Sequence, residues 1–265
     1  MLRVLRIMVA LAFFAAFNLF FLSFADAFGA LAKVQLVPAL LAGNFAVVAI
    51  VLVVTAVCGR IYCSTVCPLG VFQDIVLGLR RLVSRPAFVH HPPRPVLRLG
   101  FALAFAALVL AGCTSLAGAI DPYSLYGRFA THLFEPVAAT LVNAVAAVAE
   151  RLGHHVIMKQ TLVLRGVAAF VFAAVAFVAL VVVAAGRGRL FCNTVCPVGT
   201  LLAAVSLRPL LGVRLDAAKC VKCGLCAKVC KAECIDVKAG AVDQSRCVRC
   251  FDCLATCKKG AIKWR

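Results

Sequence analysis

Four long apolar runs dominate the chain, at residues 4–25, 38–57, 99–120 and 162–185. Each is close to the roughly 20 residues that an α-helix needs to cross the hydrocarbon core of a membrane. Two arginines near the start of the first run resemble a secretory signal, but its apolar core is too long and no clear small-residue cleavage site follows. The pattern therefore predicts four transmembrane helices, the first of them retained.

A fifth apolar run, residues 137–149, is shorter and is bounded by Glu135 and Glu150. We expect it to form an interfacial or re-entrant helix rather than a span. Four spans place eleven Lys and Arg on one side of the membrane and five on the other. The positive-inside rule then predicts a multi-pass membrane protein with both termini in the cytoplasm.

Composition agrees with a membrane protein, since 64% of the residues are hydrophobic and only 14% are charged. Soluble domains have roughly 45–50% apolar and about 25% charged residues. Disordered, collagen-like and nucleic-acid-binding proteins are thereby excluded. A net charge of +18 and 15 cysteines still allow a membrane protein, a disulfide scaffold or a metal carrier. All five histidines fall in predicted loops, so no haem is expected.

An internal repeat follows two of the apolar runs. Residues 59–70 read GRIYCSTVCPLG and residues 188–199 read GRLFCNTVCPVG, with eight of twelve positions identical at an offset of 129. Both copies should leave the membrane on the same face. The repeat therefore favours four spans arranged as two related helix pairs.

Each copy carries a Cys-x3-Cys-Pro motif, formed by Cys63 and Cys67 in the first and by Cys192 and Cys196 in the second. Proline suits the first turn of a helix, so the second cysteine of each pair should stand at a helix N-terminus, where a thiolate is stabilised. The two pairs together have the sulfurs for one site, either a further metal or cluster or a redox-active thiol pair. Alternatively, all four fill space as small hydrophobes.

Residues 214–265 differ from the rest, with 12 Lys and Arg, 5 Asp and Glu, and nine cysteines. Two Cys-x2-Cys-x2-Cys-x3-Cys runs have the spacing of a bacterial ferredoxin with two [4Fe–4S] clusters. In that arrangement the fourth cysteine of each run serves the other cluster. Cluster one is then expected on Cys220, Cys223, Cys226 and Cys257, and cluster two on Cys247, Cys250, Cys253 and Cys230. Zinc ribbons use paired Cys-x2-Cys units instead, and disulfides do not suit a cytoplasmic domain.

Two features depart from the usual ferredoxin pattern. Lys231 and Lys258 follow the fourth cysteine of each run, where proline is usual, and this puts the local packing in doubt. Cys234 is a ninth cysteine, which is a spare, a substitute ligand or a reactive thiol.

With these motifs, the chain resembles the ferredoxin-type membrane proteins of the NapH/MauN group, which are related to the iron–sulfur part of NosR. The resemblance runs from the first span to Trp264 and includes residues 121–128, which are similar to an Asn-Pro-x-Ser-x-x-Gly-Arg segment of NapH. It implies two [4Fe–4S] clusters and a role in moving quinol electrons outward. Residues 121–128 are either a turn at a helix end or a quinone or partner contact through Tyr123, Tyr126 and Arg128.

We therefore predict an all-α membrane bundle of four transmembrane helices, residues 1–213, followed by a small α+β two-cluster ferredoxin domain, residues 214–265. The predicted function is one-electron relay between the quinone pool or a cytoplasmic donor and a cytoplasmic or periplasmic redox partner, without bond-forming catalysis. A membrane reductase or thiol protein that serves metal-centre maturation is the alternative. A third interpretation is an anchor that holds a ferredoxin at the membrane.

Overall fold

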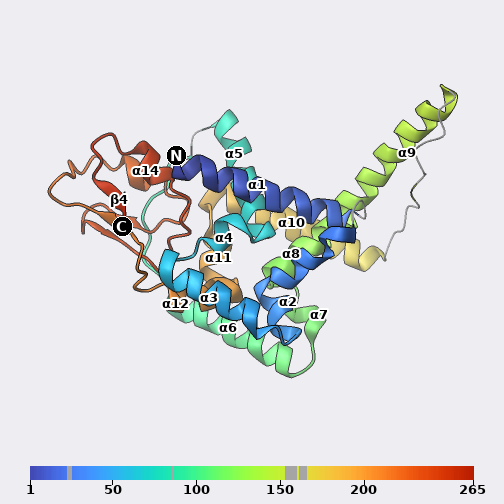
Figure 1. Ribbon diagram of the computed structural model, residues 1–265, viewed down its shortest axis with the longest axis horizontal. Coiled ribbons are helices and arrows are strands. Elements are labelled where there is room, and N and C mark those ends of the chain that lie inside the picture. The colour runs from blue at the N-terminus through green and yellow to red at the C-terminus, as the bar shows by residue number, and fades with distance from the viewer. Residues whose placement is uncertain (23–25, 85, 153–159, 161–165) are drawn as a thin grey trace.

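The computed structural model describes residues 1–22, 26–84, 86–152, 160 and 166–265. A helical bundle makes up most of it, and a small region with short strands forms the C-terminus. Figure 1 shows this C-terminal region at one end of the molecule, while helix α9 projects away at the opposite end.

Within the described residues, three helices are long and apolar enough to cross a membrane by length and composition. They are α1 (Leu2–Phe21), α10 (Val167–Arg187) and a continuous helix over Pro122–Arg151. The first and last match the predicted spans at 4–25 and 162–185, apart from residues 23–25 and 162–165, which lie outside the described residues. These helices indicate a membrane protein.

Residues 137–149 do not form a separate short helix as predicted, because they lie within a 30-residue helix over Pro122–Arg151. Their interfacial or re-entrant placement stays a prediction. The long helix consists of α8 (Pro122–Phe129), the π-helical segment η2 (Ala130–Phe134) and α9 (Glu135–Arg151). Asp121 caps its start by accepting a hydrogen bond from the Ser124 amide at 2.7 Å. The Asp-Pro signal thus begins a helix rather than a turn after one. His132, predicted in a loop, lies in η2.

The other two predicted spans are interrupted. Residues 38–57 divide into α2 (Leu36–Leu41) and α3 (Phe45–Cys58), where Asn44 caps α3 by accepting from the Val47 amide. Residues 99–120 divide into α6 (Pro95–Leu110) and the single turn α7 (Thr114–Ala117). Since α3 and α6 have 14 and 16 residues, they are shorter than a typical span, and the four-span arrangement stays a prediction.

Both repeat copies have the same order of elements. In the first, α3 is followed by α4 (Tyr62–Thr65) and α5 (Pro68–Val83); in the second, α10 is followed by α11 (Leu190–Thr194) and α12 (Pro197–Val205). Helix α5 of the first copy packs against α10 of the second. Phe72 lies at the centre of this contact, with the Phe177 ring at 5.5 Å and the Tyr126 ring at 6.2 Å. The 3-10 segment η1 (Asp26–Val34) connects α1 to α2.

The C-terminal region contains two antiparallel strand pairs and two short helices. Strand β1 (Val213–Leu215) pairs with β4 (Ile262–Trp264), and β2 (Ile235–Asp236) pairs with β3 (Ala241–Val242). Helices α13 (Leu225–Lys228) and α14 (Asp252–Thr256) follow the two cysteine-rich loops. Because the first strand pairs with the last, the region closes on itself and brings the two cysteine runs together.

Candidate iron–sulfur sites

The four cysteines predicted for cluster one line a single cavity of about 200 Å³. Three of them come from the loop before and into α13, and the fourth directly follows α14. Cys223 is exposed, Cys226 is buried, and the other two are half-buried. The crossover between the two runs, which the spacing predicts, is therefore present in the arrangement of the thiols.

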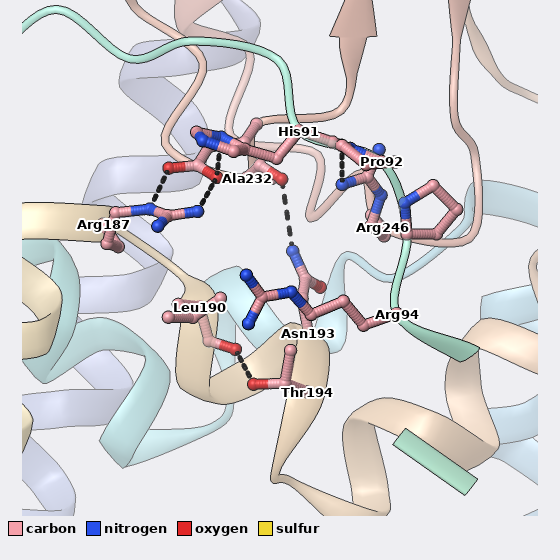
Figure 2. Close-up of a pocket in the computed structure, with 11 residues that line it drawn as sticks. His91, Pro92, Arg94, Arg187, Leu190, Asn193, Thr194, Ala232 and Arg246 are labelled. Carbon is pink, nitrogen blue, oxygen red and sulfur yellow. Dashed lines mark hydrogen bonds and ion pairs between the residues drawn. The ribbon is translucent and has the colours of Figure 1, made fainter. Parts of the chain in front are cut away.

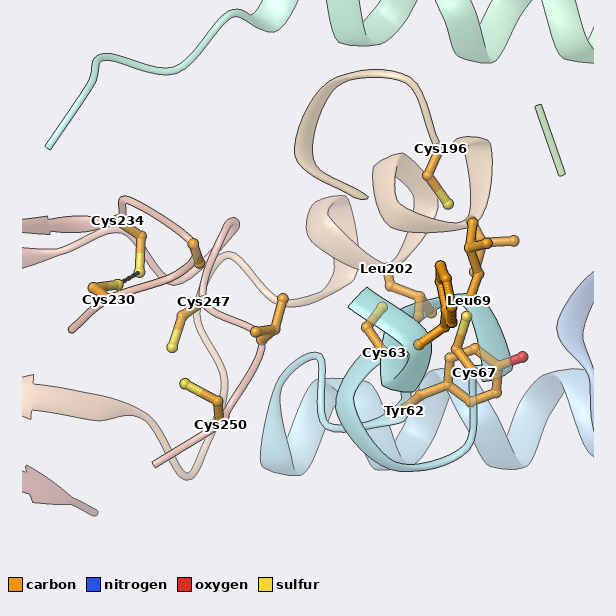
Figure 3. Close-up of a cluster of buried hydrophobic side chains, with 14 of the residues drawn as sticks. Tyr62, Cys63, Cys67, Leu69, Cys196, Leu202, Cys230, Cys234, Cys247 and Cys250 are labelled. Atoms are coloured by element: carbon orange, nitrogen blue, oxygen red, sulfur yellow. Dashed lines mark hydrogen bonds between the residues drawn. The ribbon is translucent and has the colours of Figure 1, made fainter. Parts of the chain in front are cut away.

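The four cysteines predicted for cluster two line a second cavity, which Cys234 also borders. All five are buried. Figure 3 shows Cys230 and Cys234 side by side, with Cys247 and Cys250 on the neighbouring loop. Among the described residues no three His, Cys, Asp or Glu side chains converge closely enough to hold a single metal ion. Two separate sets of four thiols have the chemistry that [4Fe–4S] clusters require.

The two cysteine loops share an unusual backbone. Lys222 and Arg249, at equivalent places in the two runs, have φ of 55° and 54°. Two residues further along each run, Gly224 and Phe251 also have left-handed backbone conformations, with φ of 73° and 61°. Three of these four are not glycine, and such residues rarely adopt positive φ. Both loops are thus curled in the same way around the space that their thiols enclose.

Cys234 acts on the thiols of cluster two. Its Sγ lies 3.5 Å from Cys230 Sγ. A hydrogen bond from Cys234 lowers the pKa of the Cys247 thiol to about 6, and another lowers the pKa of the Cys230 thiol. Cys234 itself keeps its proton, because these same bonds raise its pKa well above the usual value. Cys234 is therefore a buried thiol in hydrogen-bonding contact with a predicted cluster-two ligand, and either sulfur of the Cys230–Cys234 pair can be the donor.

The four repeat cysteines lie in one buried region between the two copies. Each is only 4% exposed, and Figure 3 shows Cys63, Cys67 and Cys196 within the bundle. Cys67 and Cys196 occupy the N-cap positions of α5 and α12, as the Cys-Pro pairs predict. The expected stabilisation of their thiolates is outweighed, however. Burial raises the pKa of both thiols, and the neighbouring repeat cysteines raise it further.

Two arginines exchange hydrogen bonds between the copies at this region. Arg60 donates to the Cys192 carbonyl at 3.0 Å, and Arg189 donates to the Cys63 carbonyl at 2.9 Å. Each guanidinium also lies 3.9 Å from the sulfur of the first cysteine in its own copy. Both arginines are fully buried. Their recurrence in the Gly-Arg pair of both repeats is the sequence signal that identifies them.

A buried carboxylate, Asp74, joins three parts of the chain. It pairs with Arg6 of α1, with Arg189 of the second repeat and with Lys231 of the C-terminal region, each at 2.7 Å. Burial alone raises the pKa of the Asp74 carboxyl, but the three cations outweigh burial and hold the pKa well below its usual range. Lys231, which replaces the usual proline after Cys230, is thus part of a buried ion network. Its ion pair with Asp74 shows how this lysine packs.

The loops of cluster two are docked on a glycine of each repeat. Gly188 has φ of 58°, and the Lys231 carbonyl packs against it. The backbone amide of Arg189 donates a hydrogen bond to that carbonyl at 2.7 Å. Gly59 has φ of 73° and lies beneath the Arg249 guanidinium, which donates to the Cys58 carbonyl at 3.0 Å. A Cβ at either glycine would overlap its partner. The cluster-two side of the C-terminal region therefore faces the repeat cysteines.

A polar pocket next to this contact holds the connecting segment before α6. Figure 2 shows Arg187 and His91 at this pocket. Arg187 donates to the Glu233 carboxylate at 3.0 and 3.1 Å, and His91 pairs with the same carboxylate at 2.9 Å. Arg246 donates to the His91 carbonyl at 2.7 Å, and Asn193 donates to a carbonyl of the C-terminal region at 3.3 Å. The chain before α6 therefore helps to hold the two parts together.

The three residues predicted to contact a quinone are engaged within the chain. Tyr126 is fully buried, and its hydroxyl donates to Asn18 at 2.8 Å. Tyr123 packs against Phe21 with ring centroids 5.5 Å apart. Arg128 donates to the Ser115 carbonyl at 2.6 Å and lies 5.1 Å from the centre of an aromatic ring. A quinone contact at these residues stays a prediction.

The remaining cysteines differ in their surroundings. Cys58 is half-buried at the end of α3, whereas Cys113 is exposed.

A family model described as a 4Fe–4S binding domain matches the chain twice, at residues 40–86 and 169–214. The two matches contain the two Cys-x3-Cys-Pro motifs, and they end before the eight cysteines of the C-terminal runs. The chain is therefore similar to ferredoxin-type 4Fe–4S proteins. Two such domains fit two [4Fe–4S] clusters and suggest iron–sulfur electron transfer. No curated protein and no solved structure matches the chain.

Proposed function

We propose that the chain is a membrane-bound iron–sulfur protein that relays electrons between the quinone pool or a cytoplasmic donor and a redox partner. The observation that carries the proposal is the gathering of the eight C-terminal cysteines into two sets of four around two cavities. The membership of each set is the one that the crossed ligand pattern of two-cluster ferredoxins requires.

The eight cysteines would hold two [4Fe–4S] clusters, which when bound supply one-electron transfer at potentials set by their surroundings. The chain's own residues set those surroundings. Cluster-two thiols are buried and receive the Cys234 hydrogen bonds, and Lys231 and Arg249 place two cations beside them. Positive charge and hydrogen bonds near a cluster favour its reduced form.

The bundle would carry the second part of the relay. We place four transmembrane helices in a bacterial inner membrane, both termini in the cytoplasm, as in the NapH/MauN group that the motifs resemble. The four repeat cysteines lie on the side of the bundle that the cluster-two loops cover, and the 4Fe–4S family matches include them. They are the candidates for a further metal or cluster next to cluster two.

The second candidate function is maturation of a metal centre by thiol chemistry. One observation favours it: the thiols of Cys63 and Cys192 each lie 3.9 Å from a buried guanidinium. Within the described residues, Arg60 has no carboxylate partner. A buried unpaired cation favours an anion nearby, and a thiolate is such an anion.

The two functions are separated by anaerobic purification of the full chain, with counts of iron and sulfide, EPR spectra and quinol oxidation. Three forms are compared: the native chain, a form with alanine at all four repeat cysteines, and a Cys113→Ala control whose thiol is exposed. Loss of quinol oxidation with both C-terminal clusters intact supports the relay. If quinol never reduces the clusters, and a metal ion or a disulfide partner reoxidises them, the result supports maturation. Absence of iron refutes both.

A further inference from the structure

Every exposed charged residue in 214–265 is a lysine or an arginine. Nine of the twelve Lys and Arg are exposed, whereas none of the five acidic residues is. Three of the acidic residues are paired, Glu233 with Arg187, Asp252 with Arg3 and Asp243 with Arg246. The other two, Asp216 and Asp236, are half-buried. The net positive charge of this region therefore faces outward, where it acts on a partner.

Three of the nine exposed cations lie at the cluster-one cavity. Lys219, Lys258 and Lys259 line the same cavity as the four cluster-one thiols, and all three are exposed. The cluster-two cysteines, in contrast, are buried, and their loops pack on the two repeats. The cluster-one side is thus the open side of the C-terminal region.

Exposed apolar side chains line the same cavity as the three lysines. Val221 and Leu225, on either side of the exposed Cys223, line the cavity and are 62% and 42% exposed. Transient redox complexes are small, and their interfaces have an apolar centre with a charged rim that steers the partner. Lipid headgroups would need only the charge, whereas this face combines charge, apolar side chains and the edge of a redox site.

We infer that this cluster-one face docks a soluble, acidic one-electron carrier protein. The inference rests on the proposed function and names the partner class for one end of the relay. One electron passes between the carrier and the centre held by Cys220, Cys223, Cys226 and Cys257, so that one partner is oxidised as the other is reduced. No proton or atom is transferred. The three lysines steer and orient the carrier, and the two apolar side chains pack against it.

The test measures binding of an acidic two-cluster ferredoxin to the full chain in neutral nanodiscs. Charge reversal of Lys219, Lys258 and Lys259 to Glu should weaken binding tenfold or more at low salt, and their change to Gln should weaken it less. The control reverses the same number of charges on the β1–β4 strands and C-terminus, at Arg214, Lys263 and Arg265, and should keep most of the affinity. Native binding should also weaken as salt rises.

Equal affinity of the native chain and the Glu variant overturns the inference, and so does an equal loss in the control. Iron and sulfide are counted in every variant, so misfolding is detected independently, and the Gln variant still tests the face if the Glu variant loses iron. Vesicles with anionic lipid form a separate arm. If the Glu variant loses vesicle binding while the native chain binds no ferredoxin, the face is a lipid contact and the inference fails. Lack of iron in the native chain would instead refute the proposed function.

Discussion

Replacing the Asp74 carboxylate by an amide should detach three parts of the molecule from one another. Asp74→Asn keeps the shape of the side chain but removes its charge. Arg6, Lys231 and Arg189 then remain buried, with side chains 6%, 4% and 0% exposed, and lose their shared counter-ion. Breaking a buried ion pair by removing one partner costs about 3–5 kcal/mol, because the remaining charge is uncompensated.

The magnitude is large enough to measure by thermal unfolding in detergent, followed by far-UV circular dichroism. For a chain of this size each 1 kcal/mol lowers the melting temperature by roughly 2–4 °C, so we expect a fall of about 6–20 °C. Asp216→Asn is the matched control, because that half-buried carboxylate only accepts a local amide hydrogen bond. A fall no larger than that of the control would refute the role of Asp74 as the central counter-ion.

The pH dependence gives an independent check. Because the pKa of Asp74 is lower in the folded chain than its ordinary value of 3.8, its stabilising effect is full above about pH 4. The effect is lost as the pH falls through the lowered value. The difference in melting temperature between the native chain and Asp74→Asn should therefore shrink in acid, and a difference that grows there would contradict the assignment.

Three other changes have defined outcomes. Gly188→Ala should weaken the seating of the C-terminal region by more than 1 kcal/mol and increase its proteolysis, whereas Gly186→Ala, with nothing near its Cβ, should not. Cys234→Ala should lower the reduction potential of cluster two by about 40 mV for each hydrogen bond of about 1 kcal/mol that is lost. EPR redox titration measures this potential, which should not change in the Cys113→Ala control. A potential that rises or stays constant would show that the Cys234 thiol does not donate to the ligands. Tyr126→Phe should cost about 1 kcal/mol of stability through its lost hydrogen bond, and a melting temperature equal to that of the native chain would contradict this.

Sequence spacing predicts two sets of C-terminal cysteine ligands because ligand spacing is a local constraint that chain geometry enforces, and cluster binding by these sets stays a prediction. The two sets of four around separate cavities agree with it. The repeat likewise predicted the helix starts at Pro68 and Pro197, since the residues of each copy fix their own turn. These features depend on a few neighbouring residues.

Features that depend on distant partners could not be predicted in this way. Glu135 and Glu150 indicated the bounds of a short helix, but the π-helical segment η2 and α9 belong to one continuous helix over Pro122–Arg151. From the sequence alone, Arg6 and Arg189 are only two of the cations on one side of the membrane. Their ion pairs with Asp74 cannot be predicted, because nothing in the sequence relates them to that residue. Local patterns identify ligands and caps, whereas buried ion networks depend on how helices pack.

The buried carboxylate also makes the two repeat copies unequal. The position equivalent to Asp74 at the offset of 129 is Ala203, and the position equivalent to Gln73 is Leu202. One copy thus contributes polar groups to the shared interior, while the other contributes apolar packing at the same depth. A symmetric dimer built from a single copy would duplicate both roles and place two carboxylates where this chain has one. Fusion into one polypeptide allows a polarised interior in which the electric field differs from one half to the other, so the two thiol pairs need not have the same redox properties.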